Sequence, residues 1–515
     1  MPFIVSTGAK KPEDPEMRKF IRSHVMIGKN RGKTLRPKNK KAVDSSVVPD
    51  PSESSSSPGD EHTAGPLVRT SPRIIPRKVG SDLSLIRFAD TIEESSLAII
   101  IEFSTIAKKA LFPLESCIAF GAKEMAWMEA LTLDAAYLHA MAFSARDYFD
   151  LLLGREMAHF RAAPACPHLV TTLRLLRERL ETLTQQHQRR DNDDDDKVVK
   201  FSTASVVLCL AFHAHIMGDL QAVRHHMQGL RKIVDLKGGL MGFGNVKLAV
   251  EILRCDLGMA LHSGTKPLFF DDLTREPYWP YPDFTGDALP LNNNDSSSNS
   301  VEDLKFLDDL DPELATAWIV TKEFCTRVNR ASATQRKLPK EYLFETMVSV
   351  MYRLLHMPSP SSSSLSPSPS PSSRFAPGTL NEATRLGLLA FTSSVFLQWA
   401  GVRLPYAHFP SLYRATLGSL DLEAASPRLL LWLLTVGAVA VFGSADDVWL
   451  RPWLRVNVEL CGVGAGGGAA GAASSSWPAM RDILDSFMWV GLVHDGPGKA
   501  VFESVIASTP DSSFR

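Results

Sequence analysis

Basic side chains are concentrated between residues 10 and 41, where twelve lysines and arginines face three acids and give a net charge of +9. Such a cluster binds nucleic acid by releasing counterions from phosphates, or acts as a nuclear import signal. A solvated charge run without a partner is the alternative. The residues expected to bind DNA or direct import are Arg18, Lys19, Arg22, Lys29, Arg31, Lys33, Arg36, Lys38, Lys40 and Lys41.

A short amphipathic helix is predicted to carry the first of these residues. Asp14 suits the N-cap, Pro15 suits the first helical position, and Gly28 is expected to end the helix. The apolar residues that recur at helical spacing are Met17, Phe20, Ile21 and Val25. Arg18, Lys19 and Arg22 would then contact phosphates from the helix, while the basic tail at 29–41 follows the nucleic acid backbone.

Three other segments could suggest a metal or phosphate site, but another explanation is favoured for each. Cys209 and His213 are four residues apart and would share a helix face near His215, but apolar neighbours surround them, so helix packing is favoured. The glycine-rich segment 238–247 lacks the Gly-Lys-Ser/Thr ending of a phosphate loop and is predicted to form a helix C-cap and turn. The four aspartates at 193–196 lie in a charged loop rather than a fixed frame. We therefore expect no metal, no cofactor and no enzyme activity.

The large apolar side chains are expected to form core rather than a ligand site. Trp127 lies beside Met128, and Trp432 lies near Leu429 and Val436 at helical spacing.

Composition indicates a large protein that does not span a membrane. The 515 residues are 44% hydrophobic, and no signal peptide is expected because Met1 is followed by only a brief apolar run. The longest apolar stretch, 429–443, is shorter than the roughly 20 residues that cross a bilayer, and we interpret it as a buried helix. Six isolated cysteines suit a reducing compartment and thiols rather than disulfides.

Shifts in composition divide the chain into a basic arm at 1–41, a disordered Ser/Pro linker at 42–80 and a helical body at 81–505. The body is predicted to be an all-α, multi-helix array, because no alternating run bounded by hairpin turns occurs in it. Low-complexity loops are expected at 190–197, 291–300, 358–371 and 462–476. The helices are expected at 83–111, 123–153, 169–186, 200–217, 220–237, 247–262, 312–330, 339–357, 380–400, 427–442, 450–460 and 478–494.

Four segments resemble, in order, the fungal-specific transcription factor domain family. The first is Arg-Ser-His-Val-Met at 22–26 beside the basic residues, and the second is the helix at 219–240 that ends in a basic residue, two glycines and a leucine. The others are 428–438 with Arg-Pro-Trp at 451–453, and the C-terminal helix at 477–489. The resemblance covers about residues 3–501 and implies the all-helical regulatory domain of that family. A pocket for a small effector is consistent with such a domain, but no residue of the sequence locates it.

The chain departs from many members of that family in its cysteines. A binuclear zinc cluster needs six closely spaced cysteines, whereas the six here are scattered and none lies in the basic arm. The resemblance is therefore to the branch that lacks the zinc cluster. It implies a nuclear transcriptional regulator whose body contacts proteins of the transcription machinery and whose arm directs import and contacts DNA. The alternative is a nuclear scaffold or co-regulator that never binds DNA, and homo-oligomerisation stays open.

Overall fold

The computed structural model describes the chain from residue 86 onward, and the predicted basic arm and linker lie outside the described residues. The chain divides into residues 1–79 and 80–515. The four predicted low-complexity loops fall wholly or mainly outside the described part as well. The described residues are 86–107, 111–121, 127–152, 166–189, 201–274, 276–285, 302–357, 374–397, 407–421, 425–463 and 476–507.

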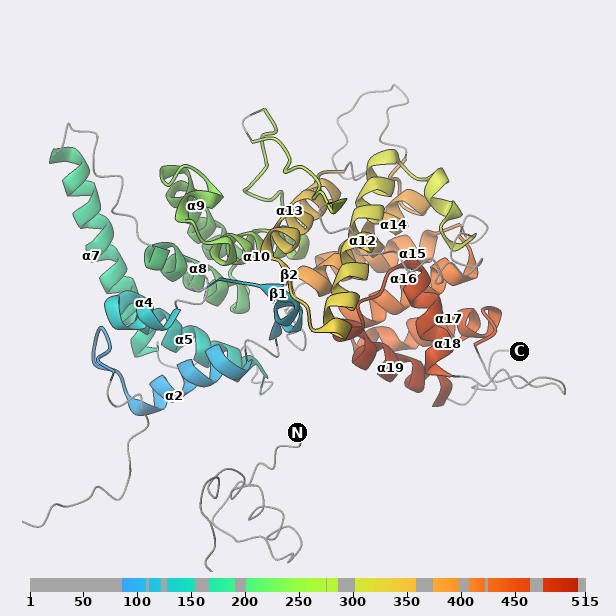
Figure 1. The fold of residues 1–515 in the computed structure, drawn as a ribbon, viewed down its shortest axis with the longest axis horizontal. Helices are drawn as coiled ribbons and strands as arrows, with labels where there is room; N and C mark the ends of the chain where they lie inside the picture. The colour runs from blue at the N-terminus through green and yellow to red at the C-terminus, as the bar shows by residue number, and fades with distance from the viewer. Residues whose placement is uncertain are drawn as a thin grey trace, which may run out of the picture. The chain divides into compact units, whose positions relative to one another are not determined.

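The described part is an array of α-helices, as predicted (Figure 1). The helices of its first half are α2 (Glu94–Glu102), α4 (Trp127–Leu133), α5 (Ala135–Leu152), α7 (Pro167–Arg189), α8 (Phe201–Ile216), α9 (Leu220–Leu236) and α10 (Val246–Ser263). Those of its second half are α12 (Pro312–Thr334), α13 (Lys340–His356), α14 (Leu380–Thr392), α15 (His408–Ser419), α16 (Pro427–Ala440), α17 (Asp447–Leu460), α18 (Trp477–Phe487) and α19 (Gly491–Ala507). The specific fold type implied by the family resemblance stays a prediction.

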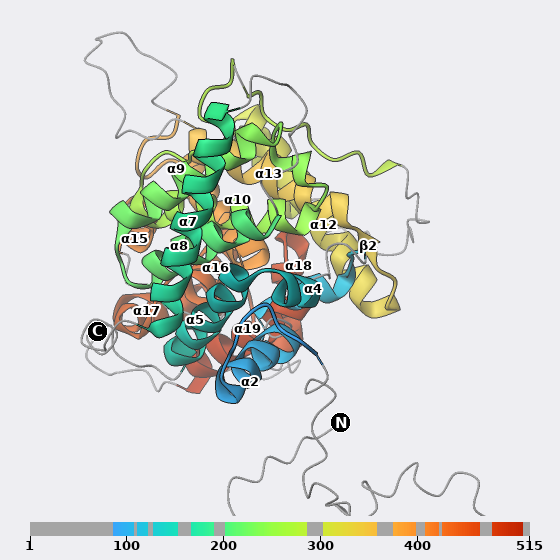
Figure 2. The same ribbon diagram turned by 90° about the vertical axis from the view of Figure 1, so that its left-hand side faces the viewer.

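Helix α10 connects two groups of helices within this body. On one side α5 packs against α2, α7 and α8, and α8 packs against α9. On the other side α16 packs against α14, α17, α18 and α19. Helix α10 contacts α8 and α9 as well as α13 and α15, and most of its residues are buried (Figures 1 and 2). Residues from both groups form one continuous hydrophobic core.

A two-stranded parallel sheet, which the sequence did not indicate, links segments far apart in the chain. Strand β1 (Ile118–Ala119) pairs with β2 (Leu338–Pro339), with Ile118 opposite Leu338. Each strand is only two residues long, so no alternating pattern could have predicted it. The pairing brings β1 into contact with α13, and the short 3-10 helix η3 (Pro113–Cys117), which precedes β1, contacts α12 and α19.

Several helix boundaries differ from the predicted ones. The helix expected at 83–111 begins only at Glu94, and its last part is the π-helix η2 (Phe103–Ala107). The helix expected at 123–153 is broken at Asp134, whose carboxylate accepts a hydrogen bond from the Tyr137 backbone and so starts α5. These breaks arise from local hydrogen bonding that hydrophobic spacing does not report.

The C-terminal helix predicted at 478–494 is also two helices. Met488 is extended between α18 and α19, and its carbonyl oxygen accepts a hydrogen bond from Trp432 Nε1 at 2.7 Å.

Two other helices also differ from the prediction. No helix was predicted where α15 lies. Helix α14 ends at Thr392, and the π-helix η10 (Ser393–Leu397) continues it, so the helix predicted at 380–400 is only partly α-helical.

Close helix packing at Gly387 gives a testable consequence. A Cβ atom there would clash with Leu433 Cδ2 and lie 3.2 Å from the Tyr413 hydroxyl, so α14 and α16 approach closely at this point. We expect Gly387→Ala to lower the free energy of unfolding by about 1–3 kcal/mol, because the added methyl overpacks the core. Gly258, inside α10, is the matched control because its Cβ would meet nothing within 4 Å. Gly258→Ala should raise the free energy of unfolding by up to about 1 kcal/mol. Chemical denaturation measures both, and equal effects of the two substitutions would contradict the packing argument.

None of the described helices combines the length and apolar character that crossing a bilayer requires. No disulfide joins the six cysteines.

Candidate functional site

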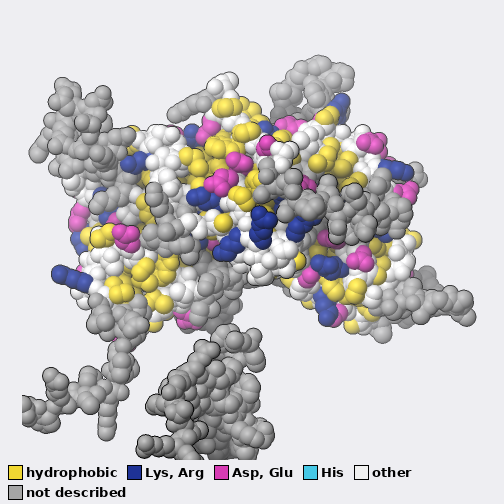
Figure 3. Space-filling model, viewed as in Figure 1, with side chains coloured by type: hydrophobic (Ala, Val, Ile, Leu, Met, Phe, Trp, Pro, Cys, Tyr) yellow, Lys and Arg dark blue, Asp and Glu magenta, His cyan; other side chains and the backbone are white. Residues whose placement is uncertain are grey.

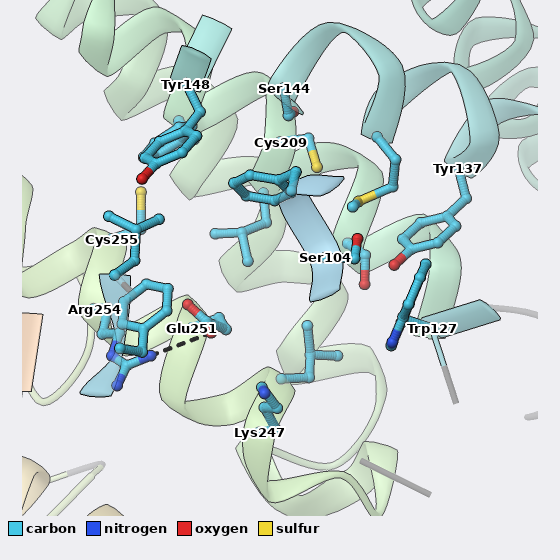
Figure 4. Close-up of a pocket in the computed structure, with 18 of the residues that line it drawn as sticks. Ser104, Trp127, Tyr137, Ser144, Tyr148, Cys209, Lys247, Glu251, Arg254 and Cys255 are labelled. Carbon is cyan, nitrogen blue, oxygen red and sulfur yellow. Dashed lines mark hydrogen bonds and ion pairs between the residues drawn. The ribbon is translucent and has the colours of Figure 1, made fainter. Parts of the chain in front are cut away.

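The ten basic residues predicted to bind DNA or direct import all lie outside the described residues. Within the described part, a cavity of about 220 Å³ lies between α5, α8 and α10 (Figure 4). We call it the aromatic cavity, after the seven aromatic side chains that line it. They are Phe103, Phe112, Trp127, Tyr137, Tyr148, Phe201 and Phe212.

One face of α5 forms a wall of the aromatic cavity. Its lining residues are Tyr137, Met141, Ser144 and Tyr148, at positions i, i+4, i+7 and i+11. This spacing places all four side chains on the same side of the helix. Three of the four carry a hydroxyl group, although α5 is buried over most of its length. Polar atoms are therefore set into a largely apolar wall.

Helices α8 and α10 supply the facing walls by the same periodicity. Helix α8 contributes Phe201, Ser205, Leu208, Cys209 and Phe212. Helix α10 contributes Lys247, Leu248, Glu251, Arg254 and Cys255, and Asn245 caps it. Figure 4 shows side chains of the three helices converging on one space, with Tyr137 and Trp127 on one side and Tyr148 and Arg254 on the other.

The rest of the lining comes from the segment that follows α2 and from α4. Phe103 and Ser104 belong to the π-helix η2, an irregular helical turn of a kind that is frequent at functional sites. Leu111 and Phe112 follow them in the lining. Trp127, which the sequence analysis assigned to the core, lines the aromatic cavity from α4 and is only partly buried. Trp127 also packs against the hydrophobic core, as predicted, so the same side chain contributes to the core and to the cavity wall.

One side of the aromatic cavity carries balanced charges. Arg254, only 2% exposed, places Nη1 3.0 Å from Glu115 and 3.2 Å from Glu251, and its Nε donates to the Phe396 carbonyl at 2.7 Å. Lys247 Nζ lies 2.7 Å from the other oxygen of Glu115. Two cations thus face two carboxylates, and no net charge is left over on the described residues of this wall.

Three buried polar atoms of the lining have no hydrogen-bond partner among the residues that the structure describes. They are Ser104 Oγ, Ser144 Oγ and Arg254 Nη2. An unsatisfied buried donor or acceptor costs about 1–3 kcal/mol, and native proteins contain few of them. These three atoms leave hydrogen-bonding capacity on the cavity wall that water or a bound molecule can use.

The size and lining of the aromatic cavity suit a small molecule. A cavity of this kind, mostly apolar with a few polar groups, is typical of small-molecule sites.

Three titratable groups of the lining are held in their neutral forms. Burial raises the pKa of the Cys255 thiol to about 12, with the Asp256 and Glu251 carboxylates adding to the shift. Burial also raises the pKa of Tyr137 and of Tyr148 above the ordinary value. All three groups are therefore neutral near neutral pH and can donate hydrogen bonds without acting as nucleophiles or bases.

The structure separates the residues that suggested a metal site. Cys209 lines the aromatic cavity, His213 Nδ1 lies 2.7 Å from Asp147, and His215 Nε2 lies 3.2 Å from His262. Burial lowers the pKa of His215 to about 3, so it is neutral in the folded protein. Helix packing, the favoured interpretation, describes His215 well, but Cys209 is part of a cavity wall.

Gly238, Gly239 and Trp432 have the structural roles that the sequence predicted. Gly238 and Gly239 have φ values of 77° and 106°, and Gly239 N donates to the Val234 carbonyl at 2.9 Å, which confirms the helix C-cap. Trp432 is fully buried in the core, as predicted.

A histidine pair outside the aromatic cavity ties three helices together. His139 Nδ1 lies 2.8 Å from His168 Nδ1, and the outer ring nitrogens contact Asp90 at 3.3 Å and Ser96 at 3.0 Å. These contacts join α5, which forms one wall of the aromatic cavity, to α7 and α2.

The sequence contained one signal for the aromatic cavity, the run of Tyr, Met, Ser and Tyr on a single face of α5. The convergence of α5, α8 and α10 on a common space was not encoded in any local pattern. No family model, no curated protein and no solved structure matches this chain.

Proposed function

We propose that this protein is a nuclear transcriptional regulator of the fungal-specific type that lacks a zinc cluster. In this proposal the basic arm directs import and contacts DNA without sequence preference. The helical body supplies regulation, and the aromatic cavity receives the signal. Proteins of the transcription machinery are its expected partners.

The observation that carries this proposal is the separation of charge along the chain. Residues 10–41 carry +9, whereas the full chain carries −1, so the remainder sums to about −10. An acidic body is repelled by nucleic acid, which leaves the arm as the part able to neutralise phosphates. A helical body with a small-molecule cavity fits the regulatory half of the same protein.

The proposal predicts salt-dependent DNA binding that needs the arm. Replacing Arg18, Lys19 and Arg22 by glutamine should weaken binding of the full chain to any duplex. The slope of log affinity against log salt concentration is negative, and its magnitude should decrease by about 3 because three phosphate contacts are lost. Fluorescence anisotropy of a labelled mixed-sequence duplex at two salt concentrations measures both effects.

The matched control replaces three exposed basic residues of the body, Arg146, Arg174 and Lys305, whose side chains are 59%, 58% and 69% exposed. These glutamine substitutions should leave the affinity and its salt slope unchanged. Equal losses in the two triple variants, or no binding by the unaltered chain, would remove DNA contact from the proposal.

The exposed face of α17 supports the second candidate function, a nuclear scaffold that acts through protein partners. Val448, Val456 and Leu460 are 84%, 54% and 66% exposed, and they recur at multiples of four residues on one side of the helix. Figure 3 shows hydrophobic side chains exposed among charged ones on the face that it displays. If the arm only directs import, the nuclear protein should be recovered with a DNA-binding partner while the purified chain leaves duplex DNA unbound.

A further inference from the structure

We propose that the aromatic cavity binds a neutral, mostly apolar molecule about the size of two fused rings, whose hydroxyl group pairs with the unsatisfied serine hydroxyls of the wall. The idea that this molecule is the signal received by the regulator rests on the function proposed above. The ligand class itself follows from the volume, the charges and the unpartnered atoms of the lining.

The volume sets the size of the ligand. An engineered cavity of about 150 Å³ lined by aliphatic and aromatic side chains stays dry and holds benzene. The aromatic cavity, at about 220 Å³, has room for a second ring or an equivalent substituent. Aromatic side chains of three elements, such as Trp127, Tyr137 and Phe212, offer ring faces and edges to a planar guest.

The charged wall selects against an anion. Arg254 and Lys247 are already paired with Glu115 and Glu251 at 2.7–3.2 Å. A bound carboxylate would add a third negative charge beside two cations in a site largely removed from water, where an unbalanced charge is costly. A neutral oxygen can accept a hydrogen bond without disturbing this balance.

The two serines determine where the polar group of the ligand would lie. Ser144 lies on the same face of α5 as Tyr137 and Tyr148, and Ser104 lies on the π-helix η2. Each Oγ lacks a hydrogen-bond partner among the described residues. Because a serine hydroxyl both donates and accepts, a ligand hydroxyl matches it better than a group that only accepts.

Three probes of matched shape test the ligand class: 1-naphthol, naphthalene and 1-naphthoate. Isothermal titration calorimetry with the full chain near neutral pH should show 1-naphthol binding at least tenfold more tightly than ionised 1-naphthoate, with naphthalene between them. Preference for 1-naphthoate, or binding of none of the three probes, would overturn the inference.

A substitution that fills the aromatic cavity tests whether the ligand binds there. Cys209→Trp places a large ring in the aromatic cavity and should abolish 1-naphthol binding. Cys461, also a partly buried cysteine but at the end of α17, provides the matched variant Cys461→Trp, which should bind as the unaltered chain does. Unchanged affinity in a folded Cys209→Trp protein would contradict the assignment.

Ser144→Ala gives a decisive result even if Cys209→Trp fails to fold. Removal of an unsatisfied buried hydroxyl should raise the melting temperature of the unliganded protein, while the affinity for 1-naphthol falls about fivefold and that for naphthalene does not fall. A lower melting temperature or an unchanged 1-naphthol affinity would contradict the role of Ser144. These measurements contain no DNA, so failure of the ligand class and failure of the DNA titration are distinguishable.

Discussion

Glu382→Ala should lower the free energy of unfolding by about 3–5 kcal/mol, because it leaves a buried arginine without its counter-charge. Glu382 and Arg385 lie one helical turn apart on α14, and their side chains are 1% and 4% exposed. The pair is bidentate, with both hydrogen bonds at 2.7 Å, and Arg385 Nη1 also donates to the Leu354 carbonyl at 2.9 Å. Chemical denaturation followed by circular dichroism measures the loss.

An exposed pair of the same two residue types provides the control. Arg174 and Glu178 on α7 are 58% and 57% exposed and lie 2.9 Å apart. Glu178→Ala should cost no more than about 0.5 kcal/mol, because water solvates the arginine that remains. A double variant, Glu382→Leu with Arg385→Met, should recover much of the loss, since the burial of a single unpaired charge is the expected cause. A small effect of Glu382→Ala, similar to that of Glu178→Ala, would show that Arg385 finds water or another partner.

The existence of most helices could be predicted because hydrophobic spacing is a local property. The predicted helix at 247–262 and the observed α10, Val246–Ser263, differ by one residue at each end. Asn245 caps its start because its side-chain oxygen accepts a hydrogen bond from Leu248 N, and Gly264, with φ of 70°, ends it. An N-cap residue and a glycine after the last helical turn can both be recognised in a single sequence.

Features that depend on distant segments could not be predicted in the same way. The break at Met488 accompanies a hydrogen bond from Trp432, which lies 56 residues earlier in the chain. The aromatic cavity joins Ser104, Ser144 and Arg254, and the missing hydrogen bonds of these residues become visible only when the neighbouring helices are in place. Trp127 illustrates the difference, because its packing against the core could be predicted from the sequence and its place in the cavity wall could not.

The carboxyl of Asp256 should make the stability of the protein depend on pH. This residue is fully buried on α10 and accepts hydrogen bonds from Leu268 N at 2.8 Å, Phe269 N at 3.1 Å and the Tyr352 hydroxyl at 2.9 Å. It thereby fastens the segment after α10 to α10 and α13. Burial raises its pKa from 3.8 to about 6, and the three hydrogen bonds limit the rise.

A raised pKa means that the folded state holds this proton more tightly than the unfolded state does. The stabilising contribution is therefore complete below about pH 3.8 and is lost as the pH rises through about 6. The shift corresponds to about 3 kcal/mol between these limits. Other groups titrate in the same range, including His262, whose pKa burial lowers to about 4, so the total stability of one protein does not isolate Asp256.

The difference between the unaltered protein and Asp256→Asn isolates this carboxyl, because the remaining groups are common to both. We expect the free energy of unfolding of the unaltered protein, minus that of Asp256→Asn, to fall by about 3 kcal/mol from pH 4 to pH 8. Urea denaturation at a series of pH values measures the difference, and Asp308→Asn, at an exposed aspartate, should change the free energy by no more than about 0.5 kcal/mol throughout. A difference that is flat, or that grows with pH, would mean that the three hydrogen bonds outweigh burial and that Asp256 is ionised in the folded protein over the whole range. In that case the carboxylate would fasten the segment after α10 most strongly at neutral pH, the reverse of the expected order.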